Sequence, residues 1–138
     1  MAGRVVAGRS DTSVMDKPAS SENVQQGWDK PWYRVRTGRF EASFLPDGEE
    51  DLDAVCNIDV VVVLADGSRW TATMFTLAAV ARLMERWTRT GEALGGRYFW
   101  CSDGVIVREP GIDNMVQVIG GLLDIEEFGD VFRRCEAE

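Results

Sequence analysis

The sequence predicts an α+β domain in the order ββαββα, with an antiparallel sheet of four or five strands and helices packed mainly on one face. Two Asp-Gly pairs each lie between short apolar runs, and a stretch with helical spacing of apolar residues follows each pair. The chain has 138 residues, of which 45% are apolar. This length and composition are sufficient for the core of one domain.

The chain is expected to divide into a disordered tail over residues 1–30 and a single folded domain over residues 31–138. The tail shows neither strand nor helix periodicity. It also holds too little apolar surface to offset the entropy lost on ordering.

The first large side chains of the domain, Trp32, Phe40 and Phe44, lie in the segment 32–45. Aromatic residues are enriched in strands, so this segment predicts a strand or a strand pair, broken near Gly38. It would either add an edge strand to the sheet or cover one of its faces.

The segment from residue 46 to residue 53 carries five acidic residues and no basic one. Its alternating acids suggest a calcium loop, but the late bidentate Glu of such a loop is not at the required offset. We therefore interpret the segment as a solvated loop that offers a binding surface to a cationic partner. The candidate binding residues in it are Asp47, Glu49, Glu50 and Asp51.

Residues 57–75 predict a β-hairpin in which Asp66-Gly67 forms a two-residue type I′ turn. This register places Val63 opposite Trp70 on the core face. The other face is then half apolar and needs a cover: the 32–45 segment, a second copy of the chain, or a partner protein. Its apolar members are Ile58, Val60, Val62, Leu64 and Phe75.

The residues after the hairpin predict an amphipathic helix with Thr76 as its N-cap and Gly91 as its exit. We expect Trp87 to be buried on this helix against the sheet. The basic side of the helix could bind phosphate, but Glu85 interrupts it, so we interpret it as a solvated face. The predicted apolar stripe comprises Leu77, Val80, Ala81, Met84 and Trp87.

A second unit of the same kind is expected 37 residues further along the chain. It would consist of a strand over 98–101, a turn at Asp103-Gly104, a return strand over 105–108 and a helix capped by Asp113. A final short helix would follow, starting with a capping box at Asp124 and Glu127. Whether the last two helices are separate or one bent helix stays open at this point.

The composition argues against several kinds of catalytic and metal site. The chain has no histidine, which removes the commonest general base, the Ser-His and Cys-His dyads and the usual zinc sets. The three cysteines form no CxxC pair, so we expect buried thiols in a reducing cytoplasm. We expect no catalytic residues, no cofactor and no metal.

The formal net charge of −8 favours a cationic protein partner and opposes binding to nucleic-acid phosphates. No apolar run approaches the roughly 20 residues of a membrane helix, and the N-terminus lacks the apolar h-region of a secretory signal, so we expect neither. We therefore expect a cytoplasmic protein that does not bind a membrane. Its arginine-rich basic complement is typical of a GC-rich bacterial genome. A homodimer remains open.

The densest group of recognition side chains lies between residues 95 and 104. One interpretation makes this group a ligand or nucleophile site. The other treats the aromatic residues as core and the polar ones as turn residues. The candidate binding residues here are Tyr98, Trp100, Ser102 and Asp103.

These motifs resemble a family of small uncharacterised bacterial proteins. The residues that carry the resemblance are Asp66-Gly67-Ser68-Arg69-Trp70, Phe75-Thr76, Gly91, Gly96, Tyr98-Phe99-Trp100 and Ser102-Asp103. The similarity covers roughly residues 57–132. That family carries no assigned activity, so the resemblance supports the domain and implies no site residues.

The sequence favours a non-enzymatic protein-binding domain, of immunity type or regulatory, that presents an acidic surface. The alternative is a small-molecule-binding domain or a carboxylate-based enzyme with a pocket near Trp100 and Asp103. A deep pocket with two carboxylates would favour the alternative, and exposed aromatic residues beside a flat acidic patch would favour the first.

Overall fold

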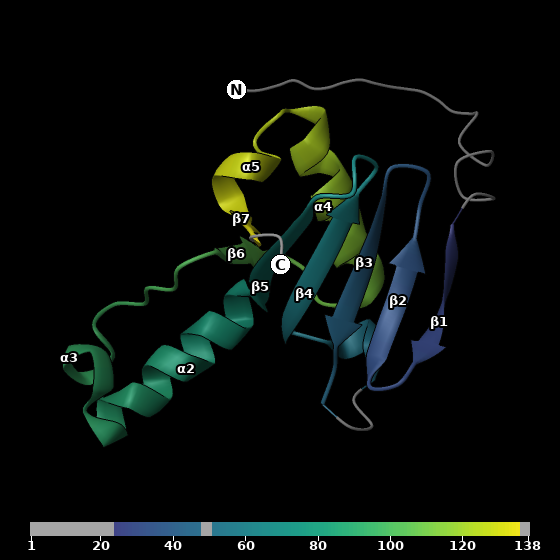
Figure 1. Ribbon diagram of the computed structural model, residues 1–138. Coiled ribbons are helices and arrows are strands. Elements are labelled where there is room, and N and C mark those ends of the chain that lie inside the picture. Colours follow the sequence, from purple (N-terminus) through teal and green to yellow (C-terminus); the bar gives the residue numbers. More distant parts are fainter. Residues whose placement is uncertain (1–23, 48–50, 136–138) are drawn as a thin grey trace.

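The computed structural model describes residues 24–47 and 51–135, which form one curved sheet with helices on one side and a projecting helical segment (Figure 1). The main path of the sheet runs through β1 (Gln25–Asp29), β2 (Trp32–Arg36), β3 (Phe40–Leu45), β4 (Asn57–Leu64), β5 (Arg69–Thr76) and β6 (Gly104–Val107). The remaining elements are η3 (Leu52–Ala54), α2 (Leu77–Thr90), α3 (Glu92–Gly96), α4 (Ile112–Asp124), α5 (Phe128–Val131) and β7 (Arg133–Arg134).

The mixed class of the fold is confirmed, but the sheet has more strands than predicted and a different order. Strands β1 to β5 form an antiparallel meander. β6 then pairs in parallel with β5, and β7 pairs with the other half of the same β5 edge. The expected second hairpin is absent from the described residues. Residues 98–101 form no strand, and β6 pairs with β5 after the chain has passed through α2.

The outermost strand lies where the sequence predicted tail. Gln25–Asp29 forms β1, so the expected boundary at residue 30 falls after this strand. All five of its residues are exposed. The strand therefore lacks the alternation of buried apolar and exposed polar residues by which a strand is recognised in a sequence. Trp28 packs edge-on against Tyr33 of β2, with 5.3 Å between the ring centroids. Residues 1–23 of the expected tail lie outside the described residues.

The turn between β4 and β5 is longer by one residue than predicted. Gly67 N donates to Leu64 O at 2.9 Å, and Leu64 N donates to Ser68 O at 3.0 Å. Gly67 has a φ of 86°, a conformation that favours glycine. The loop is therefore a three-residue turn that ends in a glycine bulge, and not a two-residue type I′ turn.

This change of register reverses the face assigned to β4. Val62, and not Val63, lies opposite Trp70. Since side chains alternate along a strand, a shift of one residue moves the whole set to the other face. The face opposite the core is mostly polar, and its central members are Asp59, Val61, Val63, Arg69, Thr71 and Thr73. The half-apolar second face was therefore wrongly predicted, and the segment 32–45 extends the sheet as β2 and β3.

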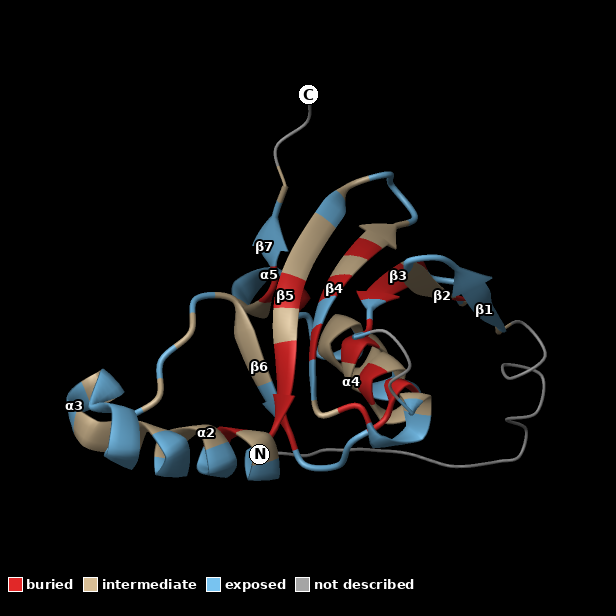
Figure 2. Cartoon of the chain, turned by 90° about the horizontal axis from the view of Figure 1, so that it is seen from below, coloured by how far each residue is buried: buried red, intermediate tan, exposed pale blue. Residues whose placement is uncertain are grey.

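The hydrophobic core lies between the sheet and the helices α4 and α5, which lie on the same side of it (Figure 2). Most of its fully buried members come from β3, β4, β5 and α4, and these are Phe44, Val60, Val62, Met74, Met115 and Ile119. We call this core with its sheet and its two helices the body. The opposite surface of the sheet is called the open face below.

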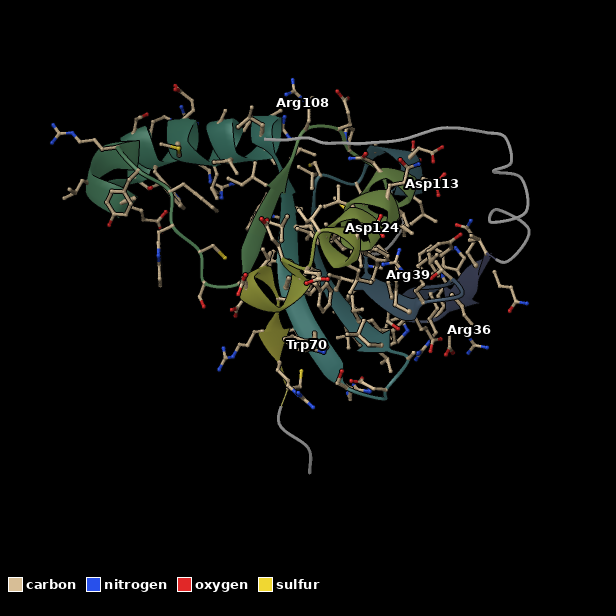
Figure 3. All side chains as sticks on the ribbon, turned by 90° about the horizontal axis from the view of Figure 1, so that it is seen from above. Arg36, Arg39, Trp70, Arg108, Asp113 and Asp124 are labelled. Carbon is tan, nitrogen blue, oxygen red and sulfur yellow. The ribbon has the colours of Figure 1, made fainter. Side chains whose placement is uncertain are left out.

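The two C-terminal helices are separate elements. α4 ends at Asp124 and α5 begins at Phe128. Neither Asp113 nor Glu127 makes the expected side-chain cap. Asp124 instead forms an ion pair of 2.8 Å with Arg39 from the turn before β3 (Figure 3). Among the helices of residues 24–47 and 51–135, none combines the length and apolar character that a membrane crossing needs.

Candidate functional site

A helical segment projects from the body, and we call it the arm; it comprises α2, α3 and residues 97–101 (Figure 1). The arm carries three strongly exposed large apolar residues, Leu77, Leu94 and Trp100. Its first helix begins as predicted, because Thr76 Oγ1 accepts a hydrogen bond of 3.0 Å from Ala79 N. The helix also ends as predicted, at Gly91 with a φ of 90°.

The arm packs on the body through a small aromatic cluster. Phe99 stacks on Trp87 with 6.2 Å between the ring centroids, and its ring also meets Phe75 of β5 edge-on at 5.1 Å. Trp87 is thus half-buried against Phe99, so the prediction that it is buried against the sheet was wrong. The predicted apolar stripe is also rotated, since Leu77 is 62% exposed and Val80 is the one buried residue of α2.

A left-handed turn reverses the chain at the far end of the arm. Ala93, Leu94, Gly95 and Gly96 all have positive φ values, between 52° and 82°. L-residues pay roughly 1–2 kcal/mol each for this conformation. Gly96 also touches α2 so closely that an added Cβ would collide with the backbone oxygen of Met84. The turn therefore requires glycine at residue 96 and strains two residues that have side chains.

The aromatic run after this turn is not the strand that was predicted. Residues 97–101 have no strand pairing, because the left-handed turn directs them back along α2. Phe99 points inward, and its two neighbours point outward: Tyr98 is 51% exposed and Trp100 is 78% exposed. Leu94 in the turn itself is 69% exposed.

Ser102 and Asp103 lie apart from these aromatic side chains, beside a shallow hollow of about 270 Å³ on the open face. Asp59 lines the same hollow, and Thr73 connects the two carboxylate residues. Thr73 Oγ1 donates to Asp59 Oδ1 at 2.7 Å, and Thr73 N donates to the backbone oxygen of Asp103 at 3.0 Å. Asp103 Oδ2 lies 3.6 Å from Arg133 Nη1. The predicted cluster is thus divided between two places, because neither Tyr98 nor Trp100 lines the hollow.

The acidic segment before β4 is partly a structural cap. Asp51 Oδ1 accepts a hydrogen bond of 3.0 Å from Asp53 N and caps the short helix η3. Asp47 and Asp51 are both exposed. The candidate residues Glu49 and Glu50 lie outside the described residues.

Two acidic residues, Asp53 of this segment and Asp113 of α4, act on the half-buried Tyr33 of β2. Burial raises the pKa of the Tyr33 phenol, and the negative charges of Asp113 and Asp53 raise it further. Tyr33 also donates a hydrogen bond of 3.0 Å to Gln26 Oε1 of β1. We call Asp51 and Asp53 at η3, together with Asp113 in the first turn of α4, the acidic rim.

The Asp66-Gly67-Ser68-Arg69-Trp70 motif has a structural explanation. Ser68 N and Ser68 Oγ both donate to Asp66 Oδ1, at 2.9 Å and 2.6 Å, and these hydrogen bonds lower the pKa of Asp66. Trp70 Nε1 donates to Ser68 Oγ at 2.9 Å. The indole thus fixed packs edge-on against Phe128 at 5.3 Å, with Arg134 over its ring. The motif closes the hairpin over α5.

The other sequence-based candidates give no further site. The three cysteines, Cys56, Cys101 and Cys135, are free thiols. Each is half-buried, whereas the sequence predicted buried thiols. In the described part of the chain, no three Cys, Asp or Glu side chains are close enough to hold a metal ion. Comparisons with protein-family models, curated proteins and solved structures found no match to this chain.

Charge is distributed unevenly between the arm and the rest of the protein. Residues 77–101 contain four arginines and two glutamates, a net charge of +2. Because the whole chain carries −8, the remaining residues carry −10. The arm is thus a basic, aromatic projection on an acidic protein.

Proposed function

We propose that this protein is a non-enzymatic protein-binding domain and that the arm is its docking surface. The exposure of Leu94, Tyr98 and Trp100 carries this proposal. Large apolar side chains gathered on an exposed element are a feature of interaction sites, and Trp and Tyr are enriched among the residues that dominate binding energy.

The backbone of the arm supports the same proposal. Strained residues persist where the surrounding structure holds them, and they cluster at functional sites. Here the strained pair Ala93 and Leu94 sets the direction in which the aromatic run leaves the turn. Phe99 then holds the run against α2, so that its neighbours Tyr98 and Trp100 are presented without a large loss of conformational entropy on binding.

The charge of the arm favours a partner with an acidic rim around an apolar pocket. This differs from the cationic partner that the net charge alone suggests, because the aromatic residues lie on the basic part of the molecule. A cationic partner would instead approach Asp51 and Asp53 on the acidic rim. Immunity-type and regulatory roles are both compatible with a domain of this kind in the cytoplasm of a bacterium.

The test compares a double variant of the arm with a control on the body. Tyr98→Ala/Trp100→Ala should abolish capture of the partner from a bacterial lysate. Ile125→Ala removes a similarly exposed apolar side chain, 57% exposed, from the far end of α4 and should leave capture intact. All three truncations should change the free energy of unfolding by less than about 0.5 kcal/mol each, since they are at the surface.

Two further measurements complete the test. Hydrogen exchange of the complex should show protection over residues 94–101. Sedimentation of the purified protein should show whether the arm binds a second copy of this chain or a different protein. Association that slows as salt increases would support the acidic partner. Retention of the partner by the double variant would contradict docking through the arm.

The alternative function is a small-molecule or carboxylate-based site in the hollow on the open face. Its support is that Asp59 and Asp103 line one hollow. Against it, Asp59 already accepts from Thr73 and Asp103 lies beside Arg133, so a substrate would have to displace both partners. Asp59→Asn should therefore leave partner capture unchanged, and a loss of capture would contradict docking through the arm alone.

A further inference from the structure

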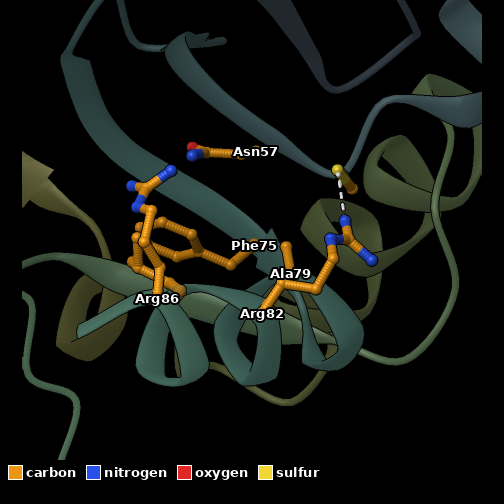
Figure 4. A pocket seen from close by; sticks show the side chains of 7 residues that line it. Asn57, Phe75, Ala79, Arg82 and Arg86 are labelled. Atoms are coloured by element: carbon orange, nitrogen blue, oxygen red, sulfur yellow. Dashed lines mark hydrogen bonds between the residues drawn. The ribbon is translucent and has the colours of Figure 1, made fainter. Parts of the chain in front are cut away.

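A second concave site lies between α2 and the adjoining ends of β4 and β5 (Figure 4). It is a cleft of about 290 Å³ at one end of the open face. The residues that line it come from the start of β4, the end of β5 and one side of α2: Cys56, Asn57, Phe75, Ala79, Arg82, Leu83 and Arg86.

Two arginines form the polar side of this cleft. Arg82 and Arg86 are four residues apart on α2, so their side chains project from the same side of the helix on successive turns. Figure 4 shows Arg86 beside Asn57, and Arg82 at the other end of the cleft, where its hydrogen bond to Cys56 is drawn as a dashed line. The side-chain amide of Asn57 can both donate and accept hydrogen bonds.

Both guanidinium groups retain capacity to bind an anion. Arg82 Nη2 donates to Cys56 Sγ at 3.4 Å, and a thiol is a weak acceptor that occupies one of the five donors of a guanidinium. Among residues 24–47 and 51–135, no carboxylate forms an ion pair with Arg82 or Arg86. Arg89, one turn further along α2, does pair with Glu85, at 3.8 Å.

The rest of the cleft is apolar. Phe75 is 7% exposed and forms the floor together with Ala79 and Leu83. Arg82 and Arg86 are themselves exposed, so the apolar floor offers contact area to a ligand and the arginines offer positive charge. The volume is at the lower end of the range of ligand pockets, which limits the ligand to a small molecule.

We infer that this cleft binds a small oxyanion ligand, a carboxylate or phosphate group attached to a small apolar body. The oxyanion lies beside Arg86, whose planar guanidinium group can donate two hydrogen bonds, and Arg82 at the other end of the cleft adds positive charge. The apolar body lies on Phe75 and Leu83, and Asn57 contacts its polar edge. This site is distinct from the exposed aromatic side chains of the proposed docking surface.

The experiment titrates the full chain with defined probes and follows the side-chain resonances of Asn57, Arg82 and Arg86 by NMR. The probes are inorganic phosphate, phenyl phosphate and benzoate, with benzyl alcohol as the neutral control. We expect saturable shifts with the anions and none with benzyl alcohol. Tighter binding of phenyl phosphate than of benzoate would identify the oxyanion as phosphate, and the reverse order would identify it as a carboxylate.

Matched variants separate this site from general attraction to positive charge. Arg86→Gln should weaken binding about tenfold or more, since it removes charge-assisted hydrogen bonds, and Arg82→Gln should weaken it by a smaller factor, since it removes only a nearby positive charge. Arg89→Gln removes the same charge outside the cleft and should leave the affinity within about twofold. Leu83→Ala should weaken benzoate and phenyl phosphate but leave inorganic phosphate unchanged.

Two results would overturn the inference. The first is a set of NMR shifts that do not saturate with the anions, or that decrease equally in Arg86→Gln and Arg89→Gln. Either pattern would indicate attraction to the overall charge of the arm. The other is wild-type affinity in both cleft variants. Tyr98→Ala/Trp100→Ala should keep the affinity for the anions, so failure of the docking proposal and failure of this one are distinguishable.

Discussion

The body and the arm of this protein are stabilised in different ways. In the body, side chains from five strands and two helices are almost completely removed from water, and several, such as Phe44 and Met115, have no exposed surface. In the arm, Val80 is the one buried residue of α2, and α3 has none. The arm depends on a few ring contacts and on one left-handed turn.

This difference assigns separate tasks to the two regions. A packed core tolerates little change in shape, whereas a segment with few buried contacts can rearrange at a small free-energy cost. The exposed aromatic residues and the arginine pair both lie on the arm, and the body holds the arm in place through Phe75 and the strand that carries it. Recognition is therefore expected where stability is lowest.

The largest effect on stability is expected from Phe44→Ala in the body. The phenyl ring has 0% exposure in the middle of the sheet, so its removal leaves a cavity and should lower the free energy of unfolding by about 3–5 kcal/mol. Urea denaturation would measure this loss. A loss below about 1 kcal/mol would mean that β3 does not form the centre of the core.

A smaller and more local effect is expected from Gly96→Ala in the arm. The added Cβ would collide with the backbone of Met84, and the residue would also be strained at its φ of 82°. We expect the end of the arm to detach at a cost of about 2 kcal/mol or more. Hydrogen exchange should then accelerate over residues 84–101 while the body keeps its protection.

Gly95→Ala is the matched control for this collision. Gly95 also has a positive φ, of 71°, but an added Cβ would meet no atom within 4 Å. Its substitution should therefore cost about 1 kcal/mol, the strain alone. Equal effects of the two substitutions would mean that the close approach of Gly96 to α2 does not hold the arm.

Trp87→Ala should be weaker than truncation in the core. The indole is half-buried and stacks on one ring, so we expect a loss of about 1–2 kcal/mol, from lost apolar area and one aromatic pair. Chemical denaturation would measure it. A loss as large as that of Phe44→Ala would place Trp87 in the core and extend the body into the arm.

The smallest effect concerns the hairpin tip and depends on pH. The hydrogen bonds from Ser68 hold the folded-state pKa of Asp66 below its ordinary value of 3.8. The folded state then binds fewer protons than the unfolded state, so stability rises with pH. The contribution of Asp66 is fully present above the ordinary value and is lost as pH falls through the lower folded-state pKa.

Denaturation of the wild type and of Asp66→Asn over a series of pH values would detect this dependence. The difference between them should be constant near neutral pH and should shrink in acid. Because the hairpin tip and the arm lie at opposite ends of β5 (Figure 2), Gly96→Ala should not alter the difference. A difference that does not change with pH would remove the role of the Asp66 charge.

Sequence reasoning was most successful where the signal is local. Thr76 and Gly91 bound α2 as predicted, because a cap depends on residues within one turn. It failed at the β4–β5 register, because Asp66-Gly67 occurs in both two-residue and three-residue turns, and the choice depends on the packing of the whole strand. β1 was missed because an exposed edge strand need not alternate.

The candidate site was predicted in part. The aromatic and polar residues between 95 and 104 were recognised, but the left-handed turn separates Trp100 from Asp103, and nothing in the residue pattern shows that direction. The spacing of Arg82 and Arg86 was visible as a basic side of a helix. Asn57, across the cleft, lies some 25 residues earlier, and its approach depends on the three-dimensional fold.

The strand β6 forms one edge of the sheet, where a strand of another molecule could pair with it. In the described residues no strand pairs with its outer edge, and Ile106 there is 50% exposed. An apolar edge of this kind is a template for aggregation. However, β6 has only four residues, and Arg108, Glu109 and Pro110 follow it directly. Short length, charge and a proline without an N–H all oppose the addition of a foreign strand, so this edge protects the protein from ordered self-assembly.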